Sequence, residues 1–113
     1  MNMNYIIDSE SNKKYYNKNG QLHREDGPAI ECTSGHKEWY KNGLRHREDG
    51  PAIEHFSGSK YWYKNSKYHR EDGPAVEYIS GDKDWYFNGK RYGINNDYTN
   101  WSWIRFVKTL IFS

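Results

Sequence analysis

The sequence contains one cysteine, three prolines and no long apolar run among its 113 residues. The lone Cys32 excludes an internal disulfide and favours a reducing compartment, so we expect a cytoplasmic protein. No stretch approaches the roughly 18 apolar residues of a membrane-spanning helix. The first five residues show neither the basic nor the apolar part of a signal peptide. A net charge of +2 argues against a dedicated nucleic-acid binder, which would carry a basic stripe.

Aliphatic residues are also scarce, and the mean hydropathy is −1.23. The chain nevertheless has eleven Tyr, five Trp and four Phe, which make up 18% of it. Disordered segments are poor in aromatic residues. We therefore expect one folded domain whose core is built mainly from large rings.

Seven residues, His-Arg-Glu-Asp-Gly-Pro-Ala, occur three times, and each copy starts 23 residues after the previous one. Such strict recurrence indicates one structural unit used repeatedly. An aromatic pair and a following Asn-Gly or Asn-Ser recur with the heptads. The heptads span 23–29, 46–52 and 69–75, and the aromatic pairs are Tyr15-Tyr16, Trp39-Tyr40, Trp62-Tyr63 and Trp85-Tyr86.

Each unit predicts two short strands. The first begins at the proline of the heptad, a Ser-Gly turn follows, and the second strand contains the aromatic pair and ends at Asn-Gly, which is typical of a type I′ hairpin turn. We expect Gly27, Gly50 and Gly73 to adopt a backbone conformation that is costly for other residues. The fold class is then mainly β: an array of antiparallel β-hairpin repeats forming a single twisted sheet of about eight strands over residues 1–94.

An even-numbered loop at the Ser-Gly turn would place Ile30 opposite Trp39 and Ala29 opposite Tyr40, and directly opposed residues share a face. The isoleucine and tryptophan rows would then form a buried face. The tyrosine row would lie on the other face with the alanines and several acids, and a sheet of one layer cannot bury both. We therefore predict that a partner binds Tyr16, Tyr40, Tyr63, Tyr86, Glu31, Glu54 and Glu77.

After residue 94 the repeat pattern fades. Residues 95–113 predict a polar connector and an amphipathic helix from Trp101 to Phe112, with Thr99 or Asn100 as its cap. Its apolar face would carry Trp103, Phe106, Val107, Leu110 and Ile111. The helix is expected to cap the array. Attachment to a membrane surface, dimerisation and insertion into a partner's groove are the alternatives.

The 23-residue period, the Asn-Gly, the following His and the aromatic-rich second strand resemble MORN repeats between Tyr5 and Gly93. His-Arg-Glu-Asp-Gly-Pro replaces the usual His-Gly-x-Gly, a variant similar to repeats of phage and giant-virus proteins and, more distantly, of YwqK-type antitoxins. The resemblance implies a meandering antiparallel sheet used for protein contact or self-association. It implies no catalytic residues.

His46, Glu48 and Asp49 could be interpreted as metal ligands or as an acid–base set. A catalytic constellation is needed once, however, and this one occurs three times. We expect structural roles instead: Asp accepting turn N–H groups, and Arg and Glu pairing between neighbouring units. No catalytic residue, metal or cofactor is predicted.

The sequence therefore predicts a non-enzymatic protein-binding repeat module. By the resemblance, it would be a small viral, phage-type protein that inhibits or redirects a host protein, such as a defence or toxin component, in the host cytoplasm. The alternative is a membrane-surface, scaffolding or self-association module anchored by the final helix. Single-stranded nucleic acid is disfavoured, because Glu31, Glu54 and Glu77 would repel its backbone.

Overall fold

The computed structural model describes residues 5–112. Its strands are short and all their pairings are antiparallel. They are β1 (Tyr5–Ile7), β2 (Lys13–Tyr15), β3 (Ile30–Glu31), β4 (Lys37–Glu38), β5 (Tyr40–Lys41), β6 (Leu44–Arg45), β7 (Ile53–Glu54), β8 (Lys60–Tyr61), β9 (Tyr63–Lys64), β10 (Lys67–Tyr68), β11 (Val76–Glu77), β12 (Lys83–Phe87) and β13 (Lys90–Ile94).

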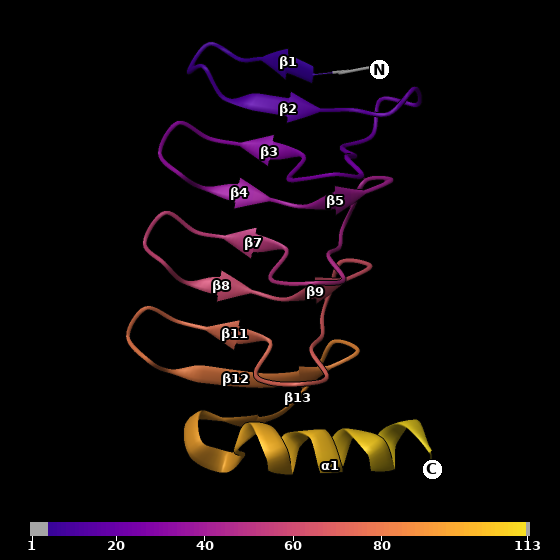
Figure 1. Cartoon of the computed structure of the whole chain (residues 1–113), viewed down its shortest axis with the longest axis vertical. Helices are drawn as coiled ribbons and strands as arrows, with labels where there is room; N and C mark the ends of the chain where they lie inside the picture. The colour runs from indigo at the N-terminus through magenta and orange to yellow at the C-terminus, as the bar shows by residue number, and fades with distance from the viewer. Residues whose placement is uncertain (1–4, 113) are drawn as a thin grey trace.

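The strands lie in a ladder from β1 at one end to β13 at the other, with the α-helix below the last strands (Figure 1). The main sheet has nine strands in the order β1-β2-β3-β4-β7-β8-β11-β12-β13. The Ser-Gly turns form one long side of the ladder, and the heptad loops and Asn-Gly turns form the other (Figure 1). The described chain measures 43 × 31 × 19 Å. This confirms the predicted mainly β hairpin array with a C-terminal helix.

The single sheet of about eight strands is confirmed by the nine-stranded main sheet, and the structure adds one detail: the second strand of two units is split. At Trp39 and Trp62 the chain leaves the main sheet, and the next residues form the two-stranded sheets β5–β6 and β9–β10. The heptad loop that follows returns the chain to the ladder. The last unit lacks this loop, and there β12 and β13 pair along almost their whole length, with an irregularity between Trp85 and Tyr86.

The hairpin turns follow the prediction. Asn42 and Gly43 both have positive φ, at 49° and 83°, as a type I′ turn requires. Asn88 and Gly89 repeat these values closely. In the Asn65-Ser66 copy the serine itself adopts a φ of 64°.

The predicted register is wrong by one residue. Ile30 lies opposite Glu38, and Glu31 lies opposite Lys37. The reason is the parity of the loop: the Cys32 N–H bonds to the His36 carbonyl and leaves three residues between them, with Gly35 at a φ of 97°. A slip of one position moves every side chain of one strand to the other face relative to its neighbour.

The corrected register exchanges the rows. The alanines share a face with the tryptophans, and the isoleucines share a face with the tyrosines. We define the tryptophan face by Ala29, Trp39, Ala52, Trp62, Ala75 and Trp85. The three alanines there are fully buried, whereas Trp39 and Trp62 are only half-buried.

The helix α1 (Asn100–Ile111) closes the end of the ladder. The Thr99 side chain accepts a hydrogen bond from the Ser102 N–H, which confirms the predicted cap. Trp103 and Val107 pack against Trp85 in the buried core, and the Trp103 indole donates to the Arg70 carbonyl at 2.8 Å. Ile111, predicted on the buried face, is 46% exposed instead. A short 3-10 helix, η1 (Asn95–Asp97), precedes α1. Within residues 5–112, no helix is long and apolar enough to cross a membrane.

Candidate partner-binding surface

A continuous row of rings and one guanidinium runs along the side of the sheet opposite the tryptophans. The Tyr63 and Tyr68 rings stack with centroids 4.5 Å apart, and Tyr68 contacts Tyr86 at 4.9 Å. The Arg45 guanidinium continues the row, 5.5 Å from the Tyr63 centroid and 5.8 Å from that of Tyr40. All five side chains are half-buried. We call this row, Tyr40, Arg45, Tyr63, Tyr68 and Tyr86, the tyrosine face.

Glu38 fixes one end of the tyrosine face. Its carboxylate accepts hydrogen bonds from the Tyr40 hydroxyl at 2.8 Å and the His36 ring Nε2 at 2.7 Å. Arg45 Nε lies 3.5 Å from the same carboxylate, an ion pair without a well-formed hydrogen bond. Burial alone would raise the pKa of Glu38. The hydrogen bonds from His36 and Tyr40 outweigh burial, so the pKa lies below its ordinary value.

Asp84 occupies the equivalent repeat position, 46 residues after Glu38, near the other end. It accepts the Tyr78 hydroxyl at 2.9 Å, and burial followed by this bond raises the pKa of Tyr78 to about 12. Burial, and then a hydrogen bond with Tyr63, also raises the pKa of Tyr68. The hydroxyls of Tyr68 and Tyr78 are therefore protonated donors at neutral pH. Together the groups offer a surface with both donors and acceptors and flat apolar rings.

The structure brings together only part of the predicted site. Tyr40, Tyr63 and Tyr86 lie on the tyrosine face, and Tyr16 is half-buried at the corresponding place in the first unit, where its backbone pairs with Leu22. The three glutamates do not join them. Neighbouring residues of a strand point to opposite faces, and Ile30 shares the side of Glu38. The prediction that Glu31, Glu54 and Glu77 lie on one surface with the tyrosines is therefore wrong. Glu31, Glu54 and Glu77 lie on the tryptophan side.

These glutamates form hydrogen-bonded ion pairs with arginines of the heptad loops. Arg47 donates through Nη1 to Glu54 at 3.0 Å and to the Pro51 carbonyl at 3.0 Å. Its guanidinium carbon lies 3.8 Å from the Trp39 ring centroid. The same contacts recur around Arg24 and Arg70, with Tyr15 and Trp62 as the rings. Arginine therefore covers the tryptophan face, and the glutamates are not free for a partner.

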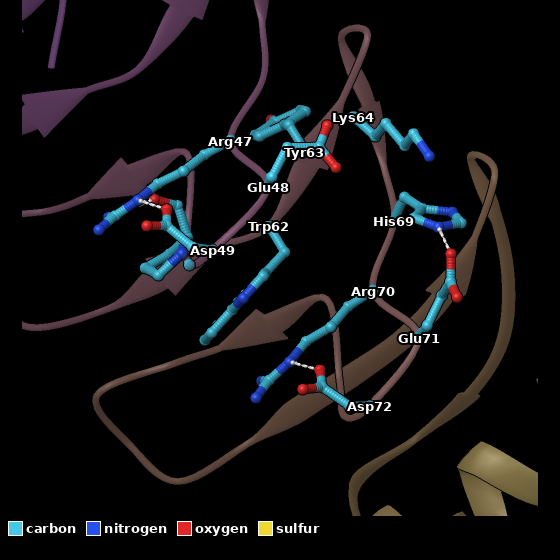
Figure 2. A pocket seen from close by; sticks show the side chains of 12 residues that line it. Arg47, Glu48, Asp49, Trp62, Tyr63, Lys64, His69, Arg70, Glu71 and Asp72 are labelled. Carbon is cyan, nitrogen blue, oxygen red and sulfur yellow. Dashed lines mark hydrogen bonds and ion pairs between the residues drawn. The ribbon is translucent and has the colours of Figure 1, made fainter. Parts of the chain in front are cut away.

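The same arginines correct two further predictions about the loops. Asp49 accepts from Arg47 Nε at 3.1 Å (Figure 2), not from turn N–H groups. Arg47 also pairs with Glu54, in the strand that follows its own loop, and not with a heptad glutamate of a neighbouring loop. Gly50 has no positive φ, so its predicted conformational role is wrong. A Cβ there would lie 2.9 Å from the Arg47 guanidinium carbon, so a larger residue would displace the guanidinium.

The heptad histidines connect one unit to the next. The Nδ1 atoms of His23, His46 and His69 accept the backbone N–H of Asn42, Asn65 and Asn88, at 2.9, 3.1 and 2.9 Å. Because Nδ1 accepts, the proton lies on Nε2, which faces Glu25, Glu48 or Glu71 of the same heptad. Each imidazole thus holds the following hairpin turn in place, a structural role.

Sequence reasoning missed two members of the tyrosine face, Arg45 and Tyr68. They occupy one repeat position, immediately before His46 and His69, but they differ chemically, so no row was visible. Their place is set by pairing across the Asn-Gly turns, where Arg45 lies opposite Tyr40 and Tyr68 lies opposite Tyr63. That hairpin register follows from the two-residue turn and was available in the sequence.

Within residues 5–112, no group of three or more His, Cys, Asp or Glu side chains is placed to hold a metal ion. Comparisons with protein-family models, with curated proteins and with solved structures gave no match for this chain. The MORN-like character of the repeats therefore stays a prediction made from the residues.

Proposed function

We propose that this chain is a non-enzymatic repeat module that binds another protein through its tyrosine face. The observation that carries the proposal is a row of aromatic rings in mutual contact, Tyr63, Tyr68 and Tyr86, that the described chain leaves half-buried. The only α-helix of residues 5–112 lies at the end of the ladder and does not cover this face (Figure 1). Tyrosine anchors interfaces well, because its ring is apolar and its hydroxyl bonds at the rim.

The chemistry of the face defines the partner surface. Glu38, Asp84 and Arg45 place both signs of charge around the rings. A partner with a flat apolar centre and a mixed polar rim would pair with it, whereas a phosphate backbone would meet the two carboxylates. The row is fixed before binding by its own stacking, so little side-chain entropy remains to be lost.

The experiment is a comparison of captured proteins. Immobilised wild type and a Tyr68→Ser, Tyr86→Ser double variant are exposed to the same lysate, and the bound proteins are quantified by mass spectrometry. A Lys37→Ser, Lys60→Ser variant on the opposite side of the sheet is the matched control. The proposal expects a protein retained by wild type and control and lost by the tyrosine variant, provided that circular dichroism shows all three folded. Equal capture by all three contradicts it.

The resemblance of the repeats also indicates a class of partner. The heptad variant is similar to repeats of small viral proteins, and we accordingly propose a host protein, such as a defence or toxin component, bound and inhibited in the host cytoplasm. The unpaired Cys32 fits a reducing compartment. Capture from host lysate, compared with lysate of an unrelated cell, tests this extension.

A second candidate function is favoured by the outer side of α1. Trp101 and Phe112 are 74% and 81% exposed, and Arg105 and Lys108 are exposed between them. Residues at these spacings form one helical stripe, which suits attachment to an anionic membrane surface. Flotation with anionic vesicles tests this, with Trp101→Ser, Phe112→Ser as the variant. Deleting the helix would be uninformative, since it removes the buried Trp103.

A further inference from the structure

A surface recess lies between successive heptad loops, and it is repeated along the array. One recess has a volume of about 660 Å³ and another about 670 Å³, and every residue lining the first has its equivalent 23 positions earlier in the second. Figure 2 shows the first of them, between the loop of Arg47 to Asp49 and the loop of His69 to Asp72. Two recesses with equivalent linings, one after the other along the array, suit a ligand whose own side chains repeat at a fixed spacing.

The lining selects the sign of the ligand's charge. Four carboxylates and three cations line the recess of Figure 2. Two of those cations, Arg47 and Arg70, also pair with Glu54 and Glu77 just outside it, so carboxylates outnumber cations six to three. Glu48 and Glu71, which bond only to neutral imidazoles, are 73% and 54% exposed. The recess therefore favours a cation.

The walls select the shape of the cation. Trp62, Tyr63 and Pro51 contribute apolar surface to the recess. A long basic side chain can lay its aliphatic stem on such surface while its charged end reaches the carboxylates. Arginine and lysine have this form, and arginine adds attraction to ring faces. A small inorganic cation would use only the carboxylates.

The spacing selects the backbone of the ligand. Successive recesses are two strands apart along the sheet, about 9.6 Å at the usual strand spacing. A polyproline II helix has three residues per turn and rises about 3.1 Å per residue, so every third side chain returns to one face after about 9.3 Å. A β-strand repeats one face about every 6.6 Å and an α-helix about every 5.4 Å. Only the polyproline II period matches.

We propose that the two recesses bind two basic side chains, three residues apart, of one proline-rich peptide in the polyproline II conformation. The peptide lies along the heptad loops, parallel to the long axis of the ladder. The inference rests on the proposed function in taking the chain as a protein-binding module. It adds a neighbouring surface, which shares Tyr40 and Tyr63 with the tyrosine face but does not include Tyr68 or Tyr86.

The test measures binding of fluorescent peptides to the full chain by anisotropy. The probe is three repeats of Arg-Pro-Pro, and two peptides of equal composition carry the arginines two or four residues apart. We expect the period-three peptide to bind at least tenfold more tightly, a gain of about 1.4 kcal/mol. Equal affinities would show attraction by charge alone and would overturn the proposal, as would the absence of binding.

Protein variants locate the peptide and separate this proposal from the previous one. Glu48→Gln, Glu71→Gln should weaken binding of the period-three peptide at least tenfold, while the control Glu10→Gln, an exposed residue outside both recesses, should not change it. Tyr68→Ser, Tyr86→Ser should lose the captured partner but keep the peptide. Peptide binding unaffected by the glutamate variant overturns the inference and leaves the proposed function standing.

Discussion

The Nδ1 atom of His46 accepts the backbone N–H of Asn65, 19 residues later, at 3.1 Å. This bond joins a heptad loop to the hairpin turn of the next unit, and it recurs between His69 and Asn88. Units of a repeat array are stabilised mainly by contacts with their neighbours. The histidines are therefore expected to carry coupling between units.

Replacing the histidines with phenylalanine keeps a ring but removes the acceptor. His46→Phe should lower the free energy of unfolding by about 1 kcal/mol, and His69→Phe by more, about 2 kcal/mol, because its bond is less exposed to water. Urea unfolding measures both. Glu48→Ala, which removes only the exposed partner of Nε2, should cost less than about 0.5 kcal/mol. An equal cost for His46→Phe and Glu48→Ala would contradict the coupling role.

Gly50 and Arg47 should be energetically coupled. A Cβ at residue 50 forces the guanidinium away from the Trp39 ring, so Gly50→Ala should cost about 1 kcal/mol in the wild type. In an Arg47→Ala background the same change should be neutral or stabilising, since alanine restricts the unfolded chain. A double-mutant cycle by chemical unfolding measures the difference. Additive effects would mean that the glycine is needed for another reason.

Glu38 should make stability sensitive to acid. Its pKa is lowered in the folded chain, so the carboxylate stabilises the fold above its ordinary pKa of 4.5, and this contribution is lost as the pH falls through the folded value. Glu38→Gln should therefore lower the stability of the fold at pH 7 and change it little at pH 3. Unfolding midpoints from pH 7 to pH 3 check this, with Glu10→Gln as the control. A difference that is constant with pH would contradict it.

Trp85 and Trp62 occupy equivalent positions with different burial. Trp85 is 1% exposed and packs against Trp103, so Trp85→Ala should cost about 3–5 kcal/mol. Trp62 is half-buried beneath Arg70, so Trp62→Ala should lower the free energy of unfolding by clearly less. Thermal unfolding gives both values. Equal costs would mean that the helix does not seal the end of the array.

The local features of the fold were predictable, because they depend on residues close in sequence. Asn42-Gly43 determines its turn through positive φ, and Thr99 caps the helix through Ser102. The face of each row was not predictable, because it depends on whether the loop at Gly35 has an odd or even number of residues. That parity is set by one backbone hydrogen bond between Cys32 and His36. Both loops fit the same sequence pattern, and a slip of one residue separated the tyrosines from their predicted glutamates.

The tyrosine face as the interaction surface is tested most directly by photocrosslinking. Benzoylphenylalanine replaces Tyr68 in one protein and Lys60 in another. Lys60 is exposed and lies on the opposite side of the sheet. After irradiation with lysate, adducts are identified by mass spectrometry. We predict a specific protein adduct from position 68 and none from position 60. An adduct from position 60 alone, or the same adduct from both positions, would contradict the account.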